Sequence, residues 1–165
     1  MSEKICAVTG SFDPITVGHL DIIRKAAGQF DKVVVLMLIN EEKQYFFSVE
    51  ERLELIRIAT RDMDNVEAVF YDGITADYCL PRGIKYLVRG IRDGSDGIYE
   101  ARLAKLNEEM GLTTLFFRAN GTHRGVSSTD AKEKMSESDF SELPTAVAEK
   151  VREYLEKRKK SGKNE

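Results

Sequence analysis

Short apolar runs, several rich in β-branched residues, alternate along the chain with stretches whose apolar residues recur at helical spacing. The apolar runs cover residues 5–8, 33–39, 66–71, 86–88 and 114–118. The run at 33–39 is continuously apolar, which is typical of a strand covered on both faces of a parallel sheet. Stretches that favour helices lie at residues 20–30, 48–63, 75–80, 95–110, 127–135 and from 144 onward.

This alternation predicts an α/β protein with a single-domain, doubly wound (Rossmann-like), five-stranded parallel sheet and helices on both faces. The length of 165 residues suits one domain. We expect the domain to span residues 1–156, followed by a charged, disordered tail at 157–165. Ser48 and Glu51 form a capping-box pattern that marks the start of the clearest helix.

Composition and charge exclude several classes of protein. The chain has 25 Lys and Arg against 28 Asp and Glu, a net charge of −3, which does not suit a strongly basic nucleic-acid binder. Cys6 and Cys79 are isolated from each other and from histidines, so we expect two buried thiols and no zinc site. The first residues hold no apolar signal core, and the longest apolar run is too short for a bilayer. We therefore expect a cytoplasmic protein with neither nucleic acid nor membrane as a partner.

In parallel sheets, ligands bind at the carboxyl ends of the strands, so polar residues directly after each predicted strand are the candidates for a site. The first such loop contains Gly10, Ser11, Gly18 and His19. A glycine lets the backbone approach a phosphate closely, and the free N–H groups of a helix start attract anions. An ordinary strand-turn-helix would explain a lone histidine. Two glycines, a hydroxyl and a histidine together favour a phosphate site.

Three further loops carry the same chemistry. Lys43 follows the second predicted strand, Arg89 and Arg92 flank Gly90 after the fourth, and three hydroxyl residues at 127–129 follow the fifth. Arginine binds oxyanions at two points through its planar fork. Each feature alone has an ordinary explanation: a solvated lysine, surface ion pairs or a helix cap. Together they predict an enzyme for a phosphate-bearing ligand.

The first loop resembles the nucleotidylyltransferase signature G-x-F-x-P-x-[HT]-x-G-H, which is matched by Gly10, Phe12, Pro14, Thr16, Gly18 and His19. With threonine rather than histidine at position 16, the loop resembles that of one branch, the phosphopantetheine adenylyltransferases. Residues 47–52 resemble the F-[ST]-x-E-E-R segment of that branch, and residues 89–92 its R-G-[LI]-R motif. Its next helix is matched by Asp96, Tyr99, Glu100, Leu103 and Asn107, and its hydroxyl segment by residues 126–129. The resemblance covers residues 4–155.

The resemblance implies transfer of AMP from ATP to 4′-phosphopantetheine, giving dephospho-coenzyme A and pyrophosphate by direct in-line attack without a covalent intermediate. It also implies Mg²⁺ as cofactor, coenzyme A as a feedback ligand and a homohexamer. The implied catalytic residues are His19, Lys43 and Arg92. The implied ATP-binding residues are Ser11, Phe12, His19, Gly90, Ile91, Arg92, Glu100, His123, Arg124, Gly125, Val126, Ser127, Ser128 and Thr129. The implied residues for the second substrate are Ser11, Lys43, Thr75, Arg89, Leu103 and Asn107.

The chain departs from this family pattern at several positions. Gln44 stands where a second lysine is common, and Gly94 and Gly97 stand where larger residues are usual. The loop at 120–125 lacks the usual proline and aromatic residue, and we expect its His123 to face solvent. These departures affect how adenine and the pantetheine arm are held rather than the phosphate chemistry.

Three alternative functions remain open. One is a nucleotidylyltransferase that uses nicotinate mononucleotide or an alcohol phosphate, against which Thr16 and the Arg89–Arg92 motif argue. Another is a non-catalytic nucleotide-binding module, against which the set of His19, Lys43 and Arg92 argues. The third is a protein-interaction module built on the charged final helix, whose apolar stripe is better explained by core packing.

Overall fold

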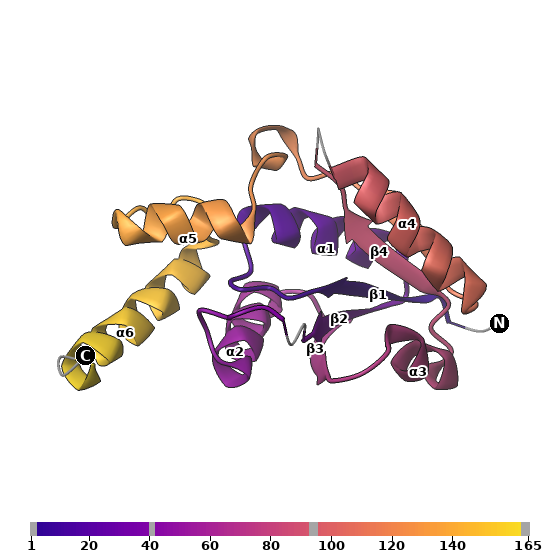
Figure 1. The fold of residues 1–165 in the computed structure, drawn as a ribbon, viewed down its shortest axis with the longest axis horizontal. Helices are drawn as coiled ribbons and strands as arrows, with labels where there is room; N and C mark the ends of the chain where they lie inside the picture. The colour runs from indigo at the N-terminus through magenta and orange to yellow at the C-terminus, as the bar shows by residue number, and fades with distance from the viewer. Residues whose placement is uncertain (1–2, 40–41, 93–95, 163–165) are drawn as a thin grey trace.

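Five parallel strands form the centre of the computed structural model, which describes residues 3–39, 42–92 and 96–162 (Figure 1). The strands are β1 (Ile5–Gly10), β2 (Lys32–Leu38), β3 (Val66–Tyr71), β4 (Tyr86–Gly90) and β5 (Thr113–Phe117). Their order in the sheet is β3-β2-β1-β4-β5, and every neighbouring pair is parallel. The direction of winding reverses between β1 and β4, so the ligand crevice of such a sheet lies beyond the ends of these two strands.

Helices cover both faces of the sheet, as the sequence predicts. They are α1 (Val17–Gln29), α2 (Val49–Thr60), α3 (Thr75–Cys79), α4 (Asp96–Glu109), α5 (Ser128–Ser136) and α6 (Thr145–Ser161), with short 3₁₀ helices η1 (Leu80–Arg82) and η2 (Gly121–His123). Helices α1 and α2 lie on one face, and α3 and α4 lie on the other. Helices α5 and α6 extend from the side of α1 and α2 (Figure 1).

Two apolar cores lie on opposite faces because successive strand residues point in opposite directions. In β1, Cys6 and Val8 enter the core beneath α1 and α2, while Ala7 enters the core beneath α3. The neighbouring strand β2 does the same, with Val35 on the first face and Leu36 on the second. Burial on both faces explains why residues 33–39 are continuously apolar.

The prediction of two buried cysteines is confirmed. Cys6 and Cys79 are both buried free thiols. Burial disfavours their thiolate forms and raises the pKa of Cys6 to about 12 and that of Cys79 to about 11. Within the described residues, no helix combines the length and the apolar character that a membrane crossing requires.

Polar side chains satisfy the ends of α1 and the start of α2. The hydroxyl of Thr16 caps α1, and Ser48 forms with Glu51 the capping box that the sequence predicts for α2. At the other end of α1, the Asn65 side chain donates hydrogen bonds to the carbonyls of Ala27 and Phe30, at 2.9 and 3.1 Å. These bonds satisfy carbonyl groups at the end of α1 that the helix cannot pair itself.

The chain end differs from the prediction. Helix α6 runs to Ser161, so the expectation of a disordered tail from residue 157 is wrong for residues 157–161. Arg158 explains the difference, because its guanidinium donates to the Phe46 carbonyl and to Glu51 across the gap to α2. Basic side chains in the last turn also suit the negative end of the helix dipole. Residues 163–165 lie outside the described residues.

Replacing Asn65 with alanine removes both hydrogen bonds to the end of α1. We expect Asn65→Ala to lower the free energy of unfolding by about 2 kcal/mol, measured by urea titration. The neighbouring exposed residue gives the control, since Asp64→Ala is expected to change this energy by less than about 0.5 kcal/mol. Equal effects of the two variants would contradict the capping role of Asn65.

Candidate active site

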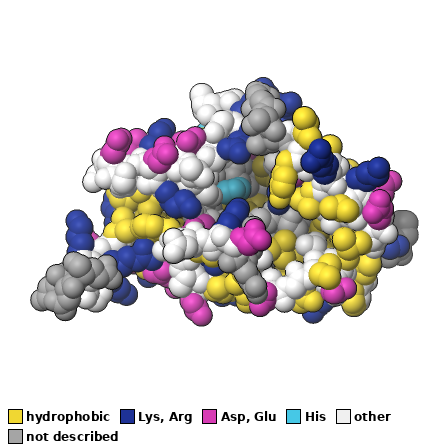
Figure 2. Space-filling view, in the orientation of Figure 1, with side chains coloured by type: hydrophobic (Ala, Val, Ile, Leu, Met, Phe, Trp, Pro, Cys, Tyr) yellow, Lys and Arg dark blue, Asp and Glu magenta, His cyan; other side chains and the backbone are white. Residues whose placement is uncertain are grey.

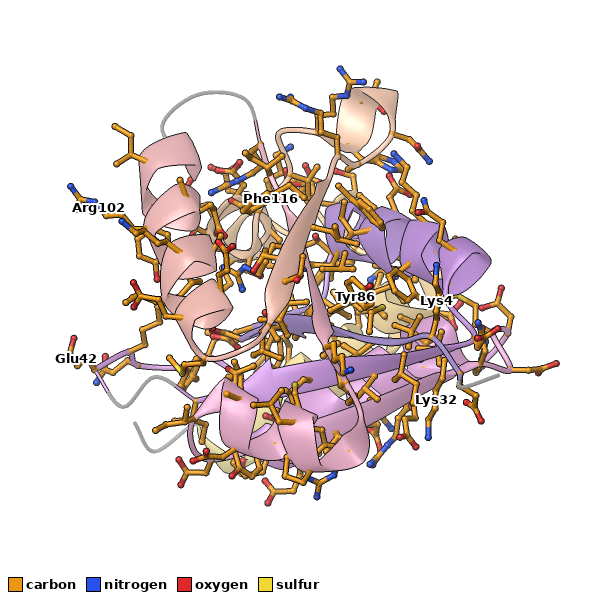
Figure 3. The ribbon with its side chains drawn as sticks, turned by 90° about the vertical axis from the view of Figure 1, so that its right-hand side faces the viewer. Lys4, Lys32, Glu42, Tyr86, Arg102 and Phe116 are labelled. Carbon is orange, nitrogen blue, oxygen red and sulfur yellow. The ribbon has the colours of Figure 1, made fainter. Side chains whose placement is uncertain are left out.

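The loops that follow the parallel strands meet at one edge of the sheet. Figure 3 shows the two ends of the strands apart, with Lys4 and Lys32 at the strand starts and Glu42 beyond the end of β2. In the face shown in Figure 2, a histidine side chain lies in a hollow bordered by lysine or arginine side chains. The fold therefore brings the four predicted loops to the same edge.

Phe12 shapes the first loop. Its side chain is buried, its backbone has φ of 48°, and its ring packs edge-on against the His19 ring with centroids 5.0 Å apart. A Cβ on Gly10 would lie 3.2 Å from the Phe12 ring, so glycine leaves room for this aromatic side chain. Because the Phe12 ring is directed inward, a contact with ATP would come from its peptide groups.

The hydrogen bonds of Thr16 fix the orientation and the tautomer of His19. The Thr16 peptide N–H donates to His19 Nδ1 at 3.0 Å, and the Thr16 hydroxyl accepts from the His19 peptide N–H at 3.3 Å. Nδ1 is therefore an acceptor, and the neutral ring carries its proton on Nε2. His19 thus presents one N–H donor on Nε2.

His19 is uncharged at neutral pH. Burial, together with the positive charges of Arg89 and Arg92, lowers the pKa of its imidazole from 6.5 to about 4. The same effect shows that both arginines, predicted from the loop after β4, lie near His19. The structure therefore brings together three of the predicted site residues, from the loops after β1 and β4.

Arg89 is held by a two-point ion pair. Its Nε and Nη2 donate to the two carboxylate oxygens of Glu100 at 3.1 and 2.8 Å, and its Nη1 donates to the Thr9 carbonyl at 3.0 Å. Glu100 is buried, and both of its carboxylate oxygens accept from Arg89. Glu100 therefore holds the Arg89 side chain in one orientation. Direct contact between Glu100 and ATP stays a prediction.

Asp13, which the sequence analysis does not select, links the first loop to the second. Its carboxylate is 3% exposed and accepts from the peptide N–H groups of Phe46 and Phe47 at 2.8 and 2.9 Å. Lys132 of α5 lies 3.3 Å from the same carboxylate. The loop that carries His19 and the segment that follows Lys43 are therefore joined by one buried group.

Arg52 of α2 makes the second link between these loops. Its guanidinium is buried and donates to the carbonyls of Phe47 and Ser11, both at 3.1 Å. A sequence signal for this role exists, because position 52 shares the apolar helix face of Leu55, Ile56 and Ala59. An arginine on a buried face needs acceptors.

The three hydroxyls of the fourth loop have different roles. Ser127 caps α5 by accepting from the Asp130 N–H at 3.1 Å, and Ser128 donates to the Pro14 carbonyl at 2.8 Å. Thr129 is exposed. Two of the three hydroxyls thus have structural partners, which agrees with the helix-cap alternative for Ser127, and phosphate binding by this segment stays a prediction.

His123 faces solvent only in part: its side chain is 40% exposed, and it also has a partner on α1. Its Nδ1 donates to the carboxylate of Asp21 at 2.6 Å, and the same carboxylate accepts from the Asn120 N–H at 3.0 Å. A Cβ on Gly18 would lie 3.2 Å from the His123 carbonyl, so glycine allows this loop to approach the start of α1. The loop at 120–125 is therefore attached to the helix that carries His19.

The other predicted residues come from β4, α3, α4 and the loops between strands and helices. Lys43 is exposed, Thr75 begins α3, and Leu103 and Asn107 lie partly buried and buried on α4. No contact between Lys43 and His19 is among those that the structure describes. The remaining loop positions are Gly90, Ile91, Arg124, Gly125 and Val126. Of the departures, Gly97 is exposed, whereas Gly94 lies outside the described residues.

Removing the Asp13 carboxylate leaves two peptide N–H groups and Lys132 without their acceptor. We expect Asp13→Ala to lower the free energy of unfolding by about 3 kcal/mol in a urea titration. Asp31 is the control, because it also accepts from a peptide N–H but is exposed, so water replaces it. Asp31→Ala is expected to cost less than about 1 kcal/mol, and an equal loss would show that Asp13 does not join the loops.

The imidazole of His19 should stay neutral well below its ordinary range. An NMR titration is expected to give a pKa near 4, and Arg92→Ala is expected to raise it by removing a nearby positive charge. In the unfolded chain the group binds its proton near 6.5, so stability from His19 is lost as the pH falls from 6.5 toward 4. A pKa at or above 6.5 in the folded protein would contradict the assigned environment.

The chain is similar to several known proteins. The cytidylyltransferase-like family matches residues 7–134. The phosphopantetheine adenylyltransferase of Thermobifida fusca (strain YX) is 41% identical over 166 residues, which cover 98% of this chain and all of that protein. The phosphopantetheine adenylyltransferase of Clostridium novyi (strain NT) is 39% identical over 132 residues, or 79% of this chain and 82% of that one.

Solved structures share the fold at low sequence identity. A putative nicotinate-nucleotide adenylyltransferase from Vibrio parahaemolyticus has a TM-score of 0.63 at 20% identity, covering 88% of this chain and 97% of that one. A lipopolysaccharide core biosynthesis protein from Thermoplasma volcanium GSS1 has a TM-score of 0.51 at 20% identity, covering 72% and 98%. The family match over residues 7–134 and the two relatives at 41% and 39% identity show that the chain belongs to the phosphopantetheine adenylyltransferases, within the cytidylyltransferase-like family.

Proposed function

We propose that this chain transfers AMP from ATP to 4′-phosphopantetheine, forming dephospho-coenzyme A and pyrophosphate. The two relatives at 41% and 39% identity, named for this activity, support the substrate assignment. The observation that carries the chemistry is the neutral His19, whose Nε2–H donor is fixed by Thr16 near two arginines. A neutral N–H donor beside positive charge suits a phosphoryl oxygen that gains negative charge during transfer.

In the proposed reaction, a phosphate oxygen of 4′-phosphopantetheine attacks the α-phosphorus of ATP directly. The new phosphorus–oxygen bond forms as the bond to the oxygen bridging the α- and β-phosphates breaks, and pyrophosphate leaves with that electron pair. The attacking oxygen is already an anion, so the step needs neither a protein nucleophile nor removal of a proton. The protein then contributes positioning and charge stabilisation.

The predicted residues nearest the phosphate chemistry have separate parts in that step. His19 donates to a non-bridging oxygen of the α-phosphate, while Lys43 and Arg92 offset the negative charge of the phosphates. Ser11 and the Arg89 guanidinium, which Glu100 orients, hold the substrates in line. The segment at 127–129 contributes contacts to the β- and γ-phosphates at the start of α5.

We propose Mg²⁺ as the companion of ATP rather than as an ion held by the protein. Over residues 3–39, 42–92 and 96–162, no group of three His, Cys, Asp or Glu residues could hold a metal ion. Asp13 and Glu100, the buried carboxylates of the loop after β1 and of α4, already accept from peptide N–H groups and from Arg89. Such a donor set does not form a protein cage for Mg²⁺.

The resemblance also supports three wider proposals: a homohexamer, feedback binding of coenzyme A and a cytoplasmic location. Helix α4 offers apolar area for either of the first two, because Ile98, Tyr99 and Leu106 are 73%, 66% and 52% exposed. Such a patch marks a surface for a ligand or a partner chain. Sedimentation of the purified protein is expected to give the mass of six chains, and a monomer at working concentration would contradict the hexamer.

Turnover with three acceptors tests the proposed reaction. Pyrophosphate release is followed with ATP, Mg²⁺ and either 4′-phosphopantetheine, nicotinate mononucleotide or glycerol 3-phosphate. We expect turnover with 4′-phosphopantetheine alone. Turnover with another acceptor would keep the reaction class and overturn the substrate, and ATP binding without turnover would favour a regulatory module.

Loss of the His19 donor should reduce turnover without unfolding the protein. We expect His19→Ala to lower kcat by about 10²- to 10³-fold, as for the loss of one preorganised donor. Arg24→Ala is the control, because Arg24 lies on the same helix in an exposed ion pair with Asp62 and should leave kcat unchanged. A loss of less than about tenfold for His19→Ala would contradict the assigned role.

A further inference from the structure

The peptide groups of Phe46 and Phe47 are bound by side chains from three other parts of the chain. Their N–H groups donate to Asp13 in the loop after β1. The Phe47 carbonyl accepts from Arg52 of α2, and the Phe46 carbonyl accepts from Arg158 of α6 at 2.8 Å. Each of the four groups has a partner, so the dipeptide is a fixed point in an otherwise irregular segment.

Arg158 is the partner that comes from farthest along the chain. The Nη2 that donates to the Phe46 carbonyl also donates to Glu51 at 2.9 Å, within the first turn of α2. Its guanidinium carbon lies 4.6 Å from the centre of the Phe46 ring and 5.2 Å from that of Phe47. Such stacking combined with a charge-assisted bond holds a planar guanidinium in one orientation.

This fixed point bears on Lys43 because only two residues separate it from Phe46. A chain of three residues spans at most about 11 Å, so the place of Phe46 limits where the Lys43 amine lies. Residues 42–48 form no helix or strand, and Lys43 itself is exposed. Side-chain anchors downstream therefore determine how well the lysine is held toward the phosphates.

We propose that Arg158 is a positioning residue for Lys43: the last turns of α6 hold the Phe46 peptide, and this keeps the lysine at the site. The proposal rests on the proposed function, in which Lys43 offsets the charge of the phosphates. Asp13 and Arg52 hold the inner side of the dipeptide when Arg158 is absent. Loss of Arg158 therefore loosens the outer side and leaves the fold in place.

A matched pair of α6 variants separates positioning from general packing. Arg158→Ala removes the bond to the Phe46 carbonyl. Arg152→Ala removes an arginine of the same helix that stacks on the Phe140 ring at 4.6 Å. We expect Arg158→Ala to lower kcat about tenfold, the effect of a lysine displaced from its working position. The Arg152→Ala control is expected to keep kcat within about twofold.

A double-mutant cycle with Lys43→Ala shows whether Arg158 acts through the lysine. If it does, Arg158→Ala lowers kcat in the native background and changes it by less than about twofold when Lys43 is already alanine. An effect of the same size in both backgrounds would overturn the proposal, as would no effect in the native background. If Arg158→Ala fails to fold, Arg158→Lys keeps one donor for the carbonyl and enters the same cycle.

Amide hydrogen exchange at Phe46 and Phe47 provides a readout that needs no turnover. The Phe47 N–H belongs to the same peptide group as the Phe46 carbonyl, so its local opening breaks one bond fewer when Arg158 is absent, although Asp13 still accepts from it. We therefore expect exchange at Phe47 to rise about tenfold in Arg158→Ala and to stay unchanged in Arg152→Ala. If the native protein shows no turnover, the proposed function is refuted. The exchange result then still tests whether Arg158 holds the Phe46 peptide. If the native protein is active, but Arg158→Ala changes neither the exchange rate nor kcat, only the positioning role of Arg158 is refuted.

Discussion

One buried carboxylate joins the two loops on which the proposed chemistry depends. Asp13 lies between β1 and α1 and accepts from two successive peptides of the segment that leads into α2. A buried carboxylate is costly unless its oxygens are paired, and here two N–H groups and Lys132 supply the partners. The loops after β1 and β2 are consequently joined through this carboxylate, and the parallel sheet sets their common edge.

The site uses positive charge in two ways. Arg89 and Arg92 are the arginines proposed to bind the substrates, and their charges also help to keep His19 neutral. A neutral imidazole with its proton on Nε2 donates one hydrogen bond, whereas a protonated ring would lose its bond from the Thr16 N–H. Glu100 balances Arg89 with a two-point ion pair, so the arginine keeps its orientation before any ligand arrives. These are features of a preorganised site, as the proposed reaction requires.

The sequence predicts the five strands and their parallel sheet because apolar runs and helical stretches alternate without interruption. It also selects His19, Arg89 and Arg92, since these types follow strands in a pattern typical of phosphate sites. It does not select Asp13, because a carboxylate beside proline has no local signal of the Phe46 and Phe47 peptides more than 30 residues away. Arg158 is missed for a similar reason: its charged neighbours resemble a solvated tail, and only the fold shows the carbonyl that it reaches.

The partners of His123 and Ser128 are also not predictable from the local sequence. Local pattern places both in a polar loop, while their partners Asp21 and Pro14 come from the first loop and helix. Pairings of this kind depend on where distant segments of the chain cross in the fold. The spacing of apolar residues along the sequence does not predict these crossings. Spacing predicts elements and strand ends well, and it does not predict which side chain of one loop meets which peptide of another.

The stereochemical course at the α-phosphorus tests the central claim that the protein positions two phosphates and forms no covalent intermediate. The measurement uses ATP that is chiral at the α-phosphorus, because one non-bridging oxygen is replaced by sulfur or by an oxygen isotope. The acceptor is 4′-phosphopantetheine. Direct in-line transfer predicts inversion of configuration in dephospho-coenzyme A. Retention would require two successive displacements through an enzyme-bound nucleotide and would contradict the account.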